Sequence, residues 1–255
     1  MEPHSESKGV LPVKHFAAYS MMVIAIFIGG GSLLLFAAFL AIGPFTIVRF
    51  YASEHQVLLW DGFLSFLFFI QHSGMIRRSF RDRLAHIMPR HYQLSAYAIT
   101  SGIALTAVVL YWQPSQTLLY EVTGLLRLLA RVISVFAFVG LSWGVRALGN
   151  FDTFGVDPIR AHLRGKPLRP SNFVVRGPYL WVRHPLYFFM LALIWSCPDV
   201  NSDRLLFNVL WTLWVFLGSY LEEKDLVAEF GERYHQYQKT VPMLLPWRGL
   251  VGRGI

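Results

Sequence analysis

The chain has 255 residues, of which 55% are hydrophobic and only 15% are charged, and its mean hydropathy is +0.44. This composition is too apolar for a soluble domain of this length and is typical of an integral membrane protein. The net charge of +8 does not indicate nucleic acid as a partner, because basic residues between apolar spans follow the positive-inside rule. The single cysteine, Cys197, excludes an internal disulfide and a cysteine metal cluster, and we expect no metal.

Three long apolar stretches predict the first membrane spans, at residues 16–43, 57–76 and 94–112. The polar segment before them, residues 1–15, is followed by an apolar run without a cleavage pattern, so we expect an uncleaved first span. The basic segment 77–90 is expected to lie in water.

The second span carries three polar residues, Asp61, Gln71 and His72. Polar groups inside a bilayer are unfavourable unless they are paired, so each is expected to face the bundle interior and find a partner. His72 is therefore a candidate for a binding pocket, with a purely structural hydrogen bond as the alternative.

The second half of the chain begins with a fourth span inside residues 118–148. A connection of residues 149–184 shows no obvious elements, and its aromatic content favours a functional loop. Two apolar helices, 186–198 and 204–221, are joined by a short polar turn and predict a helical hairpin. Residues 222–239 predict an amphipathic helix on the membrane or against the bundle.

Together these segments predict an all-α integral membrane bundle of about six helices with a C-terminal hairpin and an amphipathic cytoplasmic helix. Placing both termini in the cytoplasm puts most of the 23 lysines and arginines on that side. We divide the chain into N-terminal transmembrane helices, residues 1–148, and a core, residues 149–255, within one integrated membrane domain.

Polar recognition groups stand at the beginning of the hairpin. Arg183 and His184 directly precede Pro185, which suits the first turn of a helix. Unpaired backbone N–H groups, the helix dipole and a guanidinium would converge there and suit a carboxylate or a phosphate. The alternative is a juxtamembrane arginine that contacts lipid headgroups.

The hairpin also predicts which residues return to this end. Two antiparallel helices of similar length bring Glu222 and Glu223 back to the membrane face from which Arg183 and His184 depart. A carboxylate there can hold an amine, a ribose or a reacting proton, whereas a solvated pair of surface glutamates is the alternative.

Several motifs in this half resemble the isoprenylcysteine carboxyl methyltransferase family in their order and spacing: Arg183-His184-Pro185-Leu186-Tyr187, Glu222-Glu223, residues 230–234 with Tyr237, and residues 241–246. A wider resemblance is to the bacterial methanethiol S-methyltransferases of the NnrU-like group. It rests on Gln71-His72-Ser73, Trp112-Gln113-Pro114, residues 151–155 and residues 164–167.

The resemblance implies a methyltransferase of the bacterial inner membrane that uses S-adenosylmethionine in a cytoplasmic pocket. The family's motif residues fall on Arg183, His184, Tyr187, Glu222 and Glu223. The methionyl carboxylate would suit Arg183 or His184, and a glutamate would suit the amino group. The sulfonium would suit the ring of Tyr179 or Tyr187.

For the methyl acceptor, the wider resemblance implies a small thiol, methanethiol, that is converted to dimethyl sulfide. Glu222 or Glu223 is the candidate general base, Arg183 would stabilise the thiolate, and His72 would line the acceptor pocket. The family often has a glycine where this chain has Phe189, which predicts a narrower pocket.

A transporter or assembly factor of the bilayer is an alternative, against which stands the location of the polar groups at the predicted cytoplasmic ends of the helices and not at mid-bilayer. Two other functions also stay open at this point. One is carboxyl methylation of a prenylcysteine-like or other lipid acceptor. The other is a haem-dependent isomerase of the NnrU-like group, with His72 and His184 as axial ligands. Membrane lipid is an expected partner in each case, and the sequence leaves the oligomeric state open.

Overall fold

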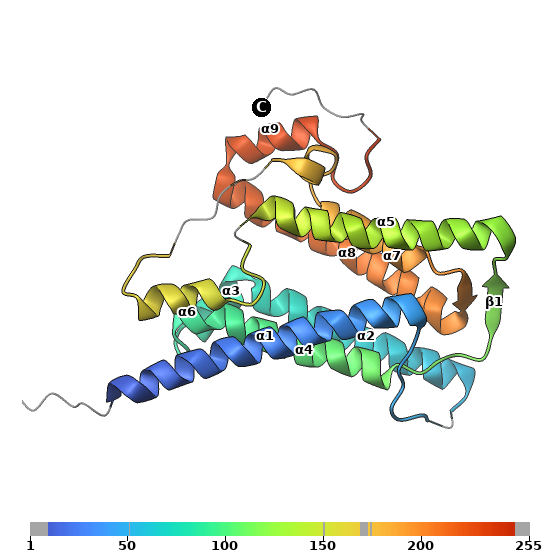
Figure 1. Cartoon of the computed structure of the whole chain (residues 1–255), viewed down its shortest axis with the longest axis horizontal. Coiled ribbons are helices and arrows are strands. Elements are labelled where there is room, and N and C mark those ends of the chain that lie inside the picture. Colours follow the sequence, from blue (N-terminus) through green and yellow to red (C-terminus); the bar gives the residue numbers. More distant parts are fainter. Residues whose placement is uncertain (1–9, 51, 150, 169–172, 174, 248–255) are drawn as a thin grey trace, which may run out of the picture. The chain divides into compact units, whose positions relative to one another are not determined.

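The computed structural model describes residues 10–50, 52–149, 151–168, 173 and 175–247, with the side chains of residues 10–14 left out. The predicted N-terminal polar segment therefore lies largely outside the described residues, as do Arg169 and Pro170 of the 149–184 connection. The helices in chain order are α1 (Val10–Ile42), α2 (Glu54–Ile76), α3 (Arg78–Leu84), α4 (Arg90–Tyr111), α5 (Gly124–Leu148), α6 (Val156–Leu163), α7 (Pro185–Trp195), α8 (Ser202–Phe230) and α9 (Glu232–Thr240) (Figure 1).

Five of the described helices are long and apolar enough to cross a membrane: α1 from His15 onward, α2, α4, α5 and α8. The sixth apolar helix, α7, has 11 residues and is shorter than a full span. Its Pro185 stands at the first helical position, where the missing N–H needs no partner. The protein is an all-α membrane helical bundle, as its composition predicts.

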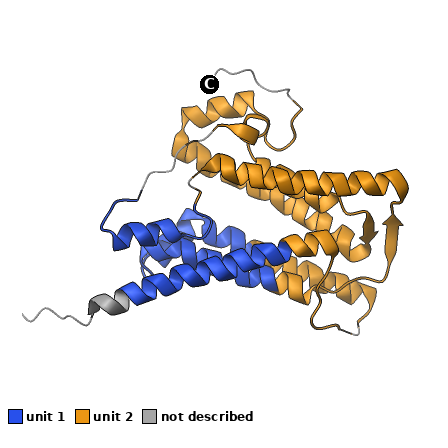
Figure 2. Ribbon diagram, viewed as in Figure 1, with its two compact units in different colours: residues 1–36, 70–106, 152–170 blue, residues 37–69, 107–151, 171–255 orange. Residues whose placement is uncertain are grey.

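The chain forms two compact units (Figure 2). Unit 1 comprises residues 1–36, 70–106 and 152–170, and unit 2 comprises residues 37–69, 107–151 and 171–255. Helices α1, α2 and α4 contribute to both units, so chain order alone does not reveal this division. The predicted functional division between residues 148 and 149 is a different one and stays a prediction.

The 149–184 connection contains two elements that the sequence analysis missed, α6 and the 3-10 helix η1 (Gly177–Leu180). Asp152 caps α6, because its Oδ1 accepts the backbone N–H of Val156 at 3.0 Å and its Oδ2 accepts that of Asp157 at 2.7 Å. With eight residues, α6 is too short to show a clear helical period in the sequence.

Gly155, which precedes α6, explains part of the 151–155 motif. Its φ is +69°, and a Cβ at this position would lie 2.3 Å from the backbone nitrogen of Ser95. The hydroxyl of Ser95 donates to the carbonyl oxygen of Gly155 at 2.8 Å. Only glycine fits both the conformation and the close approach of α4.

The polar residues of the second span have partners, as predicted. In unit 1, the amide of Gln71 donates to the hydroxyl of Thr100 at 3.1 Å, and the hydroxyl of Tyr97 lies 2.9 Å from Nε2 of His72. In unit 2, buried Asp61 accepts the backbone N–H of Gln113 at 2.9 Å.

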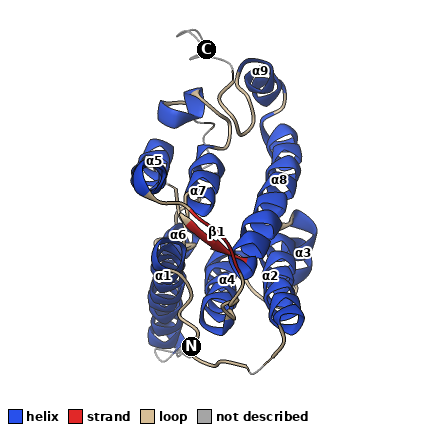
Figure 3. Ribbon diagram, turned by 90° about the vertical axis from the view of Figure 1, so that its right-hand side faces the viewer, coloured by secondary structure: helices blue, strands red, loops and turns tan. Residues whose placement is uncertain are grey.

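Unit 2 contains a small antiparallel sheet of β1 (Leu118–Glu121) and β2 (Asp199–Asn201), coloured red in Figure 3. Tyr120 is opposite Val200, and Glu121 is opposite Asp199. The fourth span, expected inside residues 118–148, is α5, which begins at Gly124, and the first residues of that stretch form β1 instead. The predicted polar turn of the hairpin likewise forms β2. Strands of three and four residues are too short to produce a recognisable alternation.

Helix α7 packs closely on α5, and two glycines of α5 permit this contact. A Cβ at Gly140 would lie 2.2 Å from the ring of Phe189, and a Cβ at Gly144 would lie 2.6 Å from Leu186. Phe189 is 1% exposed and contacts Phe136 edge to face. The large side chain of Phe189 thus fills the space above Gly140, and the narrower ligand pocket stays a prediction.

Helix α8 continues to Phe230, nine residues beyond the predicted end of its span. The prediction of one amphipathic helix over residues 222–239 is therefore wrong: its first half belongs to α8, and α9 follows after Gly231, whose φ is +57°. Charged residues such as glutamate and lysine are good helix formers and do not end a helix, whereas a glycine in the left-handed region does.

The apolar face predicted for this region packs inside unit 2. Tyr234, Tyr237 and Val241 form a buried cluster with Phe173 and Phe230. This cluster holds α9 next to the last turns of α8, where the candidate site lies.

Candidate functional site

The site is built at the beginning of α7, where the chain leaves η1. The backbone N–H of Arg183 donates to the carbonyl oxygen of Pro242 at 2.9 Å, and that of His184 donates to the carbonyl oxygen of Met243 at 3.1 Å. The N–H groups of these two residues are therefore paired with the C-terminal segment, and the binding of an anion at this helix start stays a prediction. We call residues Gln238 to Met243 the C-terminal strap.

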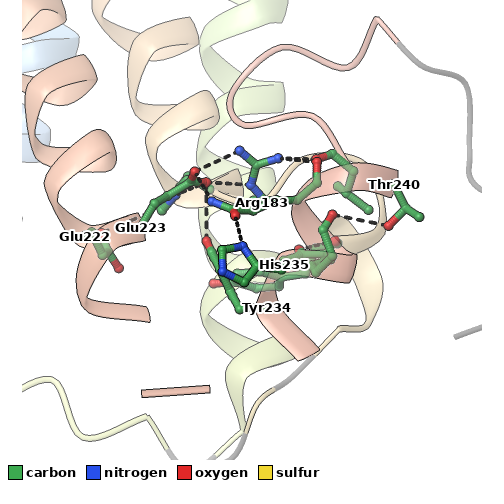
Figure 4. Close-up of polar contacts among 11 residues, drawn as sticks. Arg183, Glu222, Glu223, Tyr234, His235 and Thr240 are labelled. Carbon is green, nitrogen blue, oxygen red and sulfur yellow. Dashed lines mark hydrogen bonds and ion pairs between the residues drawn. The ribbon is translucent and has the colours of Figure 1, made fainter. Parts of the chain in front are cut away.

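Glu223 lies at the centre of the site and is 8% exposed. Its carboxylate accepts from Arg183 through Nε at 2.5 Å and Nη2 at 2.9 Å (Figure 4). It also accepts from Gln238 at 2.9 Å and from Tyr234 at 3.3 Å, and Nε2 of His184 lies 3.2 Å away. Four side chains thus surround one carboxylate, two from the residues directly before α7 and two from α9.

Arg183 connects this carboxylate to the strap. Its Nη1 donates to the carbonyl oxygens of Gln238, at 3.2 Å, and of Val241. The side chain of Arg183 is only 9% exposed. The guanidinium thus has protein partners along two of its edges. Towards Glu223 it forms the strong bidentate arrangement of arginine with a carboxylate. Towards the strap it donates to backbone carbonyl oxygens.

Glu222, the neighbouring residue on α8, has different surroundings and points away from this cluster (Figure 4). Its side chain is 47% exposed, and its Oε2 accepts the hydroxyl of Tyr187 at 3.0 Å. Nδ1 of His184 lies 3.8 Å from the same oxygen. The rings of His184 and Tyr187 are stacked, with centroids 5.6 Å apart.

Three tyrosines line the buried side of the site. The hydroxyl of Tyr237 donates to the carbonyl oxygen of Tyr179 at 2.5 Å. Burial raises the pKa of Tyr179, Tyr234 and Tyr237 above the ordinary value, and the charges of Glu222 near Tyr179 and of Glu223 near Tyr234 raise it further. The three hydroxyls therefore stay protonated, and those of Tyr234 and Tyr237 donate to Glu223 and to the carbonyl oxygen of Tyr179.

The structure brings together six of the seven predicted site residues in unit 2: Tyr179, Arg183, His184, Tyr187, Glu222 and Glu223. Their individual roles stay predictions. The seventh, His72, belongs to unit 1, where it contacts Tyr97. Its predicted place in an acceptor pocket also stays a prediction.

Sequence reasoning missed two participants, Tyr234 and Gln238. Tyr234 was named only as part of the family-like motif of residues 230–234 and was given no role in the site, and nothing in the sequence distinguishes Gln238. The motif of residues 241–246 contains a signal that could have been used, because its carbonyl groups are the acceptors that fix Arg183 and His184.

The side chains around Glu222 suit a positively charged ligand. A half-exposed carboxylate next to a tyrosine hydroxyl and an aromatic face attracts ammonium or sulfonium. The residues therefore fit a cationic methyl donor. Among the residues that the structure describes, no group of three or more histidine, cysteine, aspartate or glutamate side chains could hold a metal ion.

Comparison with known proteins places the chain in a family. No protein-family model matches it, and no solved structure is significantly similar. Methanethiol S-methyltransferase of Pseudomonas deceptionensis is 35% identical over 202 residues, which are 76% of this chain and 75% of that protein. Methanethiol S-methyltransferase 1 of Bradyrhizobium diazoefficiens is 32% identical over 197 residues, which are 77% and 69% of the two chains.

A more distant relative is Nurim of Rattus norvegicus, which is 26% identical over 181 residues, 66% of this chain and 68% of Nurim. The matches to the two bacterial enzymes extend over most of both chains and agree with the helical membrane fold and with the motifs around Arg183. This chain is a membrane enzyme of the methyltransferase class and belongs to the methanethiol S-methyltransferase family.

Proposed function

We propose that the chain transfers the methyl group of S-adenosylmethionine to methanethiol and releases dimethyl sulfide. The observation that carries this proposal is the hydrogen bond between Tyr187 and the half-exposed carboxylate of Glu222. This pair lies beside the buried ion pair of Arg183 and Glu223. The names of the bacterial relatives, which this chain matches over 75% and 69% of their length, support the same acceptor.

The methyl donor supplies an activated methyl group on a sulfonium. Glu222 and the rings of Tyr179, Tyr187 and His184 are the proposed contacts for its cationic end. Arg183, paired with Glu223, completes the site by holding the C-terminal strap in place. All of these residues lie in residues 149–255, which supports our proposal that this segment is the cofactor-binding core.

Methyl transfer to a thiol disperses charge, so catalysis depends mainly on alignment of the reactants and exclusion of water. Methanethiol is small and apolar, and it can reach a membrane enzyme through the bilayer. The general base predicted at Glu222 or Glu223, and the thiolate contact predicted for Arg183, stay predictions. The internal pairing of Arg183 supports a structural role for its guanidinium.

We further propose that the protein lies in the bacterial inner membrane with both termini in the cytoplasm. The clustering of basic residues in the N-terminal segment, in residues 77–90 and in the connection before α7 supports this orientation. The donor site then faces the cytoplasm, where S-adenosylmethionine is made.

The test is a comparison of acceptors in membranes that contain the protein and S-adenosylmethionine. Methanethiol, hydrogen sulfide, a longer alkanethiol and farnesylcysteine would be offered in parallel, with headspace detection of dimethyl sulfide for methanethiol and release of S-adenosylhomocysteine for all four. We expect the highest kcat/KM with methanethiol. A much higher kcat/KM with farnesylcysteine would refute the thiol assignment and would favour carboxyl methylation of a lipid acceptor.

A further inference from the structure

A short connection in unit 1 joins two of the membrane spans. Helix α2 ends at Ile76 and α4 begins at Arg90, and both helices are long and apolar enough to cross a membrane. The connection between these two ends contains α3 (Figure 1). Because the spans on both sides end here, α3 and the turn after it lie at the surface of the bilayer.

This connection, together with the first residue of α4, is strongly basic. Residues 77–90 contain five arginines and one aspartate, which gives a net charge of +4. The aspartate, Asp82, pairs with Arg90 at 3.2 Å, and their side chains are 65% and 78% exposed. The segment keeps an excess of positive charge beyond this pair, and such an excess attracts anionic lipid headgroups at a membrane surface.

The same segment exposes two large apolar side chains. Ile87 is 85% exposed and Phe80 is 38% exposed. The backbone around Ile87 is hydrogen-bonded, because its N–H donates to the carbonyl oxygen of Leu84 at 3.1 Å and that of Met88 donates to the same oxygen at 2.8 Å. An apolar side chain held in such an exposed position is unfavourable in water and favourable at the boundary between headgroups and acyl chains.

The apolar and cationic side chains of this segment belong together. Phe80, Arg83 and Ile87 are separated by three and four residues, which is the spacing of one helical face, and they follow each other through α3 and the hydrogen-bonded turn after it. The turn is fixed to α4, because the amide of buried Gln93 donates to the carbonyl oxygen of Arg81 at 3.1 Å. A fixed backbone thus presents both kinds of side chain at the membrane surface.

We propose that residues 77–90 form a binding surface for anionic phospholipids, the α3 surface. Phe80 and Ile87 insert at the boundary between headgroups and acyl chains, and the arginines bind lipid phosphates. A guanidinium suits phosphate through two parallel hydrogen bonds, and its aliphatic stem can lie along apolar surface while the charge stays among the headgroups. The expectation that this segment lies in water then holds for its charged groups alone. The inference concerns the lipid partner and is independent of the methyl acceptor.

The depth of Ile87 in the bilayer tests the insertion. The chain has a single cysteine, so a nitroxide label on Ile87→Cys in a Cys197→Ser background reports on one position. In bilayers that contain phosphatidylglycerol, the label should collide more often with oxygen than with a water-soluble nickel chelate. The control is the same label on Arg164→Cys, at the exposed end of α6 in the same unit, which should show the reverse order.

Lipid selectivity tests the arginines. Native mass spectrometry would count the lipids that the full-length protein retains from an equal mixture of phosphatidylglycerol and phosphatidylcholine. Arg81→Gln combined with Arg83→Gln should lower the preference for phosphatidylglycerol at least fivefold, since one basic residue near an anionic membrane surface contributes about that factor. Arg164→Gln combined with Lys166→Gln removes the same charge from exposed positions of the same unit and should keep the wild-type preference.

Three results would overturn the proposal. If the label at Ile87 is as accessible to the nickel chelate as the label at Arg164, the segment lies in water and its arginines suit a soluble polyanion instead of a bilayer. If the wild-type protein retains both lipids equally, anionic phospholipid is not its partner. If the two charge variants lose the same preference, the selectivity comes from the net charge of the protein and not from the α3 surface.

Discussion

The two glutamates of this site differ in burial, since Glu223 is buried and the side chain of Glu222 is half-exposed, and different roles follow from this difference. The meeting of Arg183, His184, Glu222 and Glu223 could be predicted, because two helices of known length return to the same end. Which glutamate faces Arg183 could not be predicted. It depends on the rotation of α8 about its axis, and that rotation is fixed by contacts with Tyr234, with Gln238 and with strap carbonyls that no sequence pattern reveals.

At this scale, Arg183→Lys should lower turnover about tenfold to a hundredfold while the protein still inserts and folds. Lysine cannot bind both oxygens of Glu223 and two strap carbonyls at once, and a charge-assisted contact contributes about 1.5 to 3 kcal/mol. Steady-state kinetics with methanethiol would measure this, with Arg164→Lys on the exposed end of α6 as control. Equal turnover in the two variants would show that the fork geometry of Arg183 is not needed.

At the scale of elements, the length of a helix or strand determines whether it can be predicted from the sequence. The five long helices are predictable because the apolar stretch of each is long enough to cross a bilayer. The short elements β1, β2 and α6 are set by tertiary contacts, such as the two hydrogen bonds that Arg127 donates to Asp199, the first residue of β2. The end of α8 depends on a single glycine, Gly231, after a run of charged helix formers.

The contact between α5 and α7 gives a prediction for stability. Gly140→Ala should destabilise the protein by about 1 to 3 kcal/mol, because the new Cβ would overlap the ring of Phe189. Thermal unfolding in detergent would show a lower Tm. Combining Gly140→Ala with Phe189→Leu should recover part of the loss.

Gly218→Ala on α8 is the matched control for this pair, since no atom lies within 4 Å of the added Cβ. It should keep or raise the Tm, because alanine favours a helix over glycine. A Tm for Gly140→Ala at or above that of Gly218→Ala would contradict the packing described for Phe189.

For the whole molecule, composition and hydropathy were sufficient to predict a helical membrane protein. The assembly of unit 1 from three separated stretches was not predictable, because its boundaries cut through α1, α2 and α4 and are defined by packing. The family motifs are shared between the units: those around Arg183 and Glu223 belong to unit 2, and Gln71-His72-Ser73 belongs to unit 1.

His72→Asn tests whether unit 1 contributes to the same reaction. If His72 lines the acceptor pocket, KM for methanethiol should rise several-fold while the affinity for S-adenosylhomocysteine stays at the wild-type value. His162→Asn, on α6 of the same unit, serves as control. Wild-type kinetics in His72→Asn would leave this histidine with only its structural contact to Tyr97.

The most direct test of the central claim uses S-adenosylmethionine with a trideuterated methyl group. The purified protein in lipid bilayers would be given this donor and unlabelled methanethiol, and the headspace would be analysed by mass spectrometry. The account predicts dimethyl sulfide that is three mass units heavier than the unlabelled compound, formed in proportion to the enzyme and lost in Arg183→Ala. Protein that binds S-adenosylhomocysteine but releases no labelled dimethyl sulfide would contradict it.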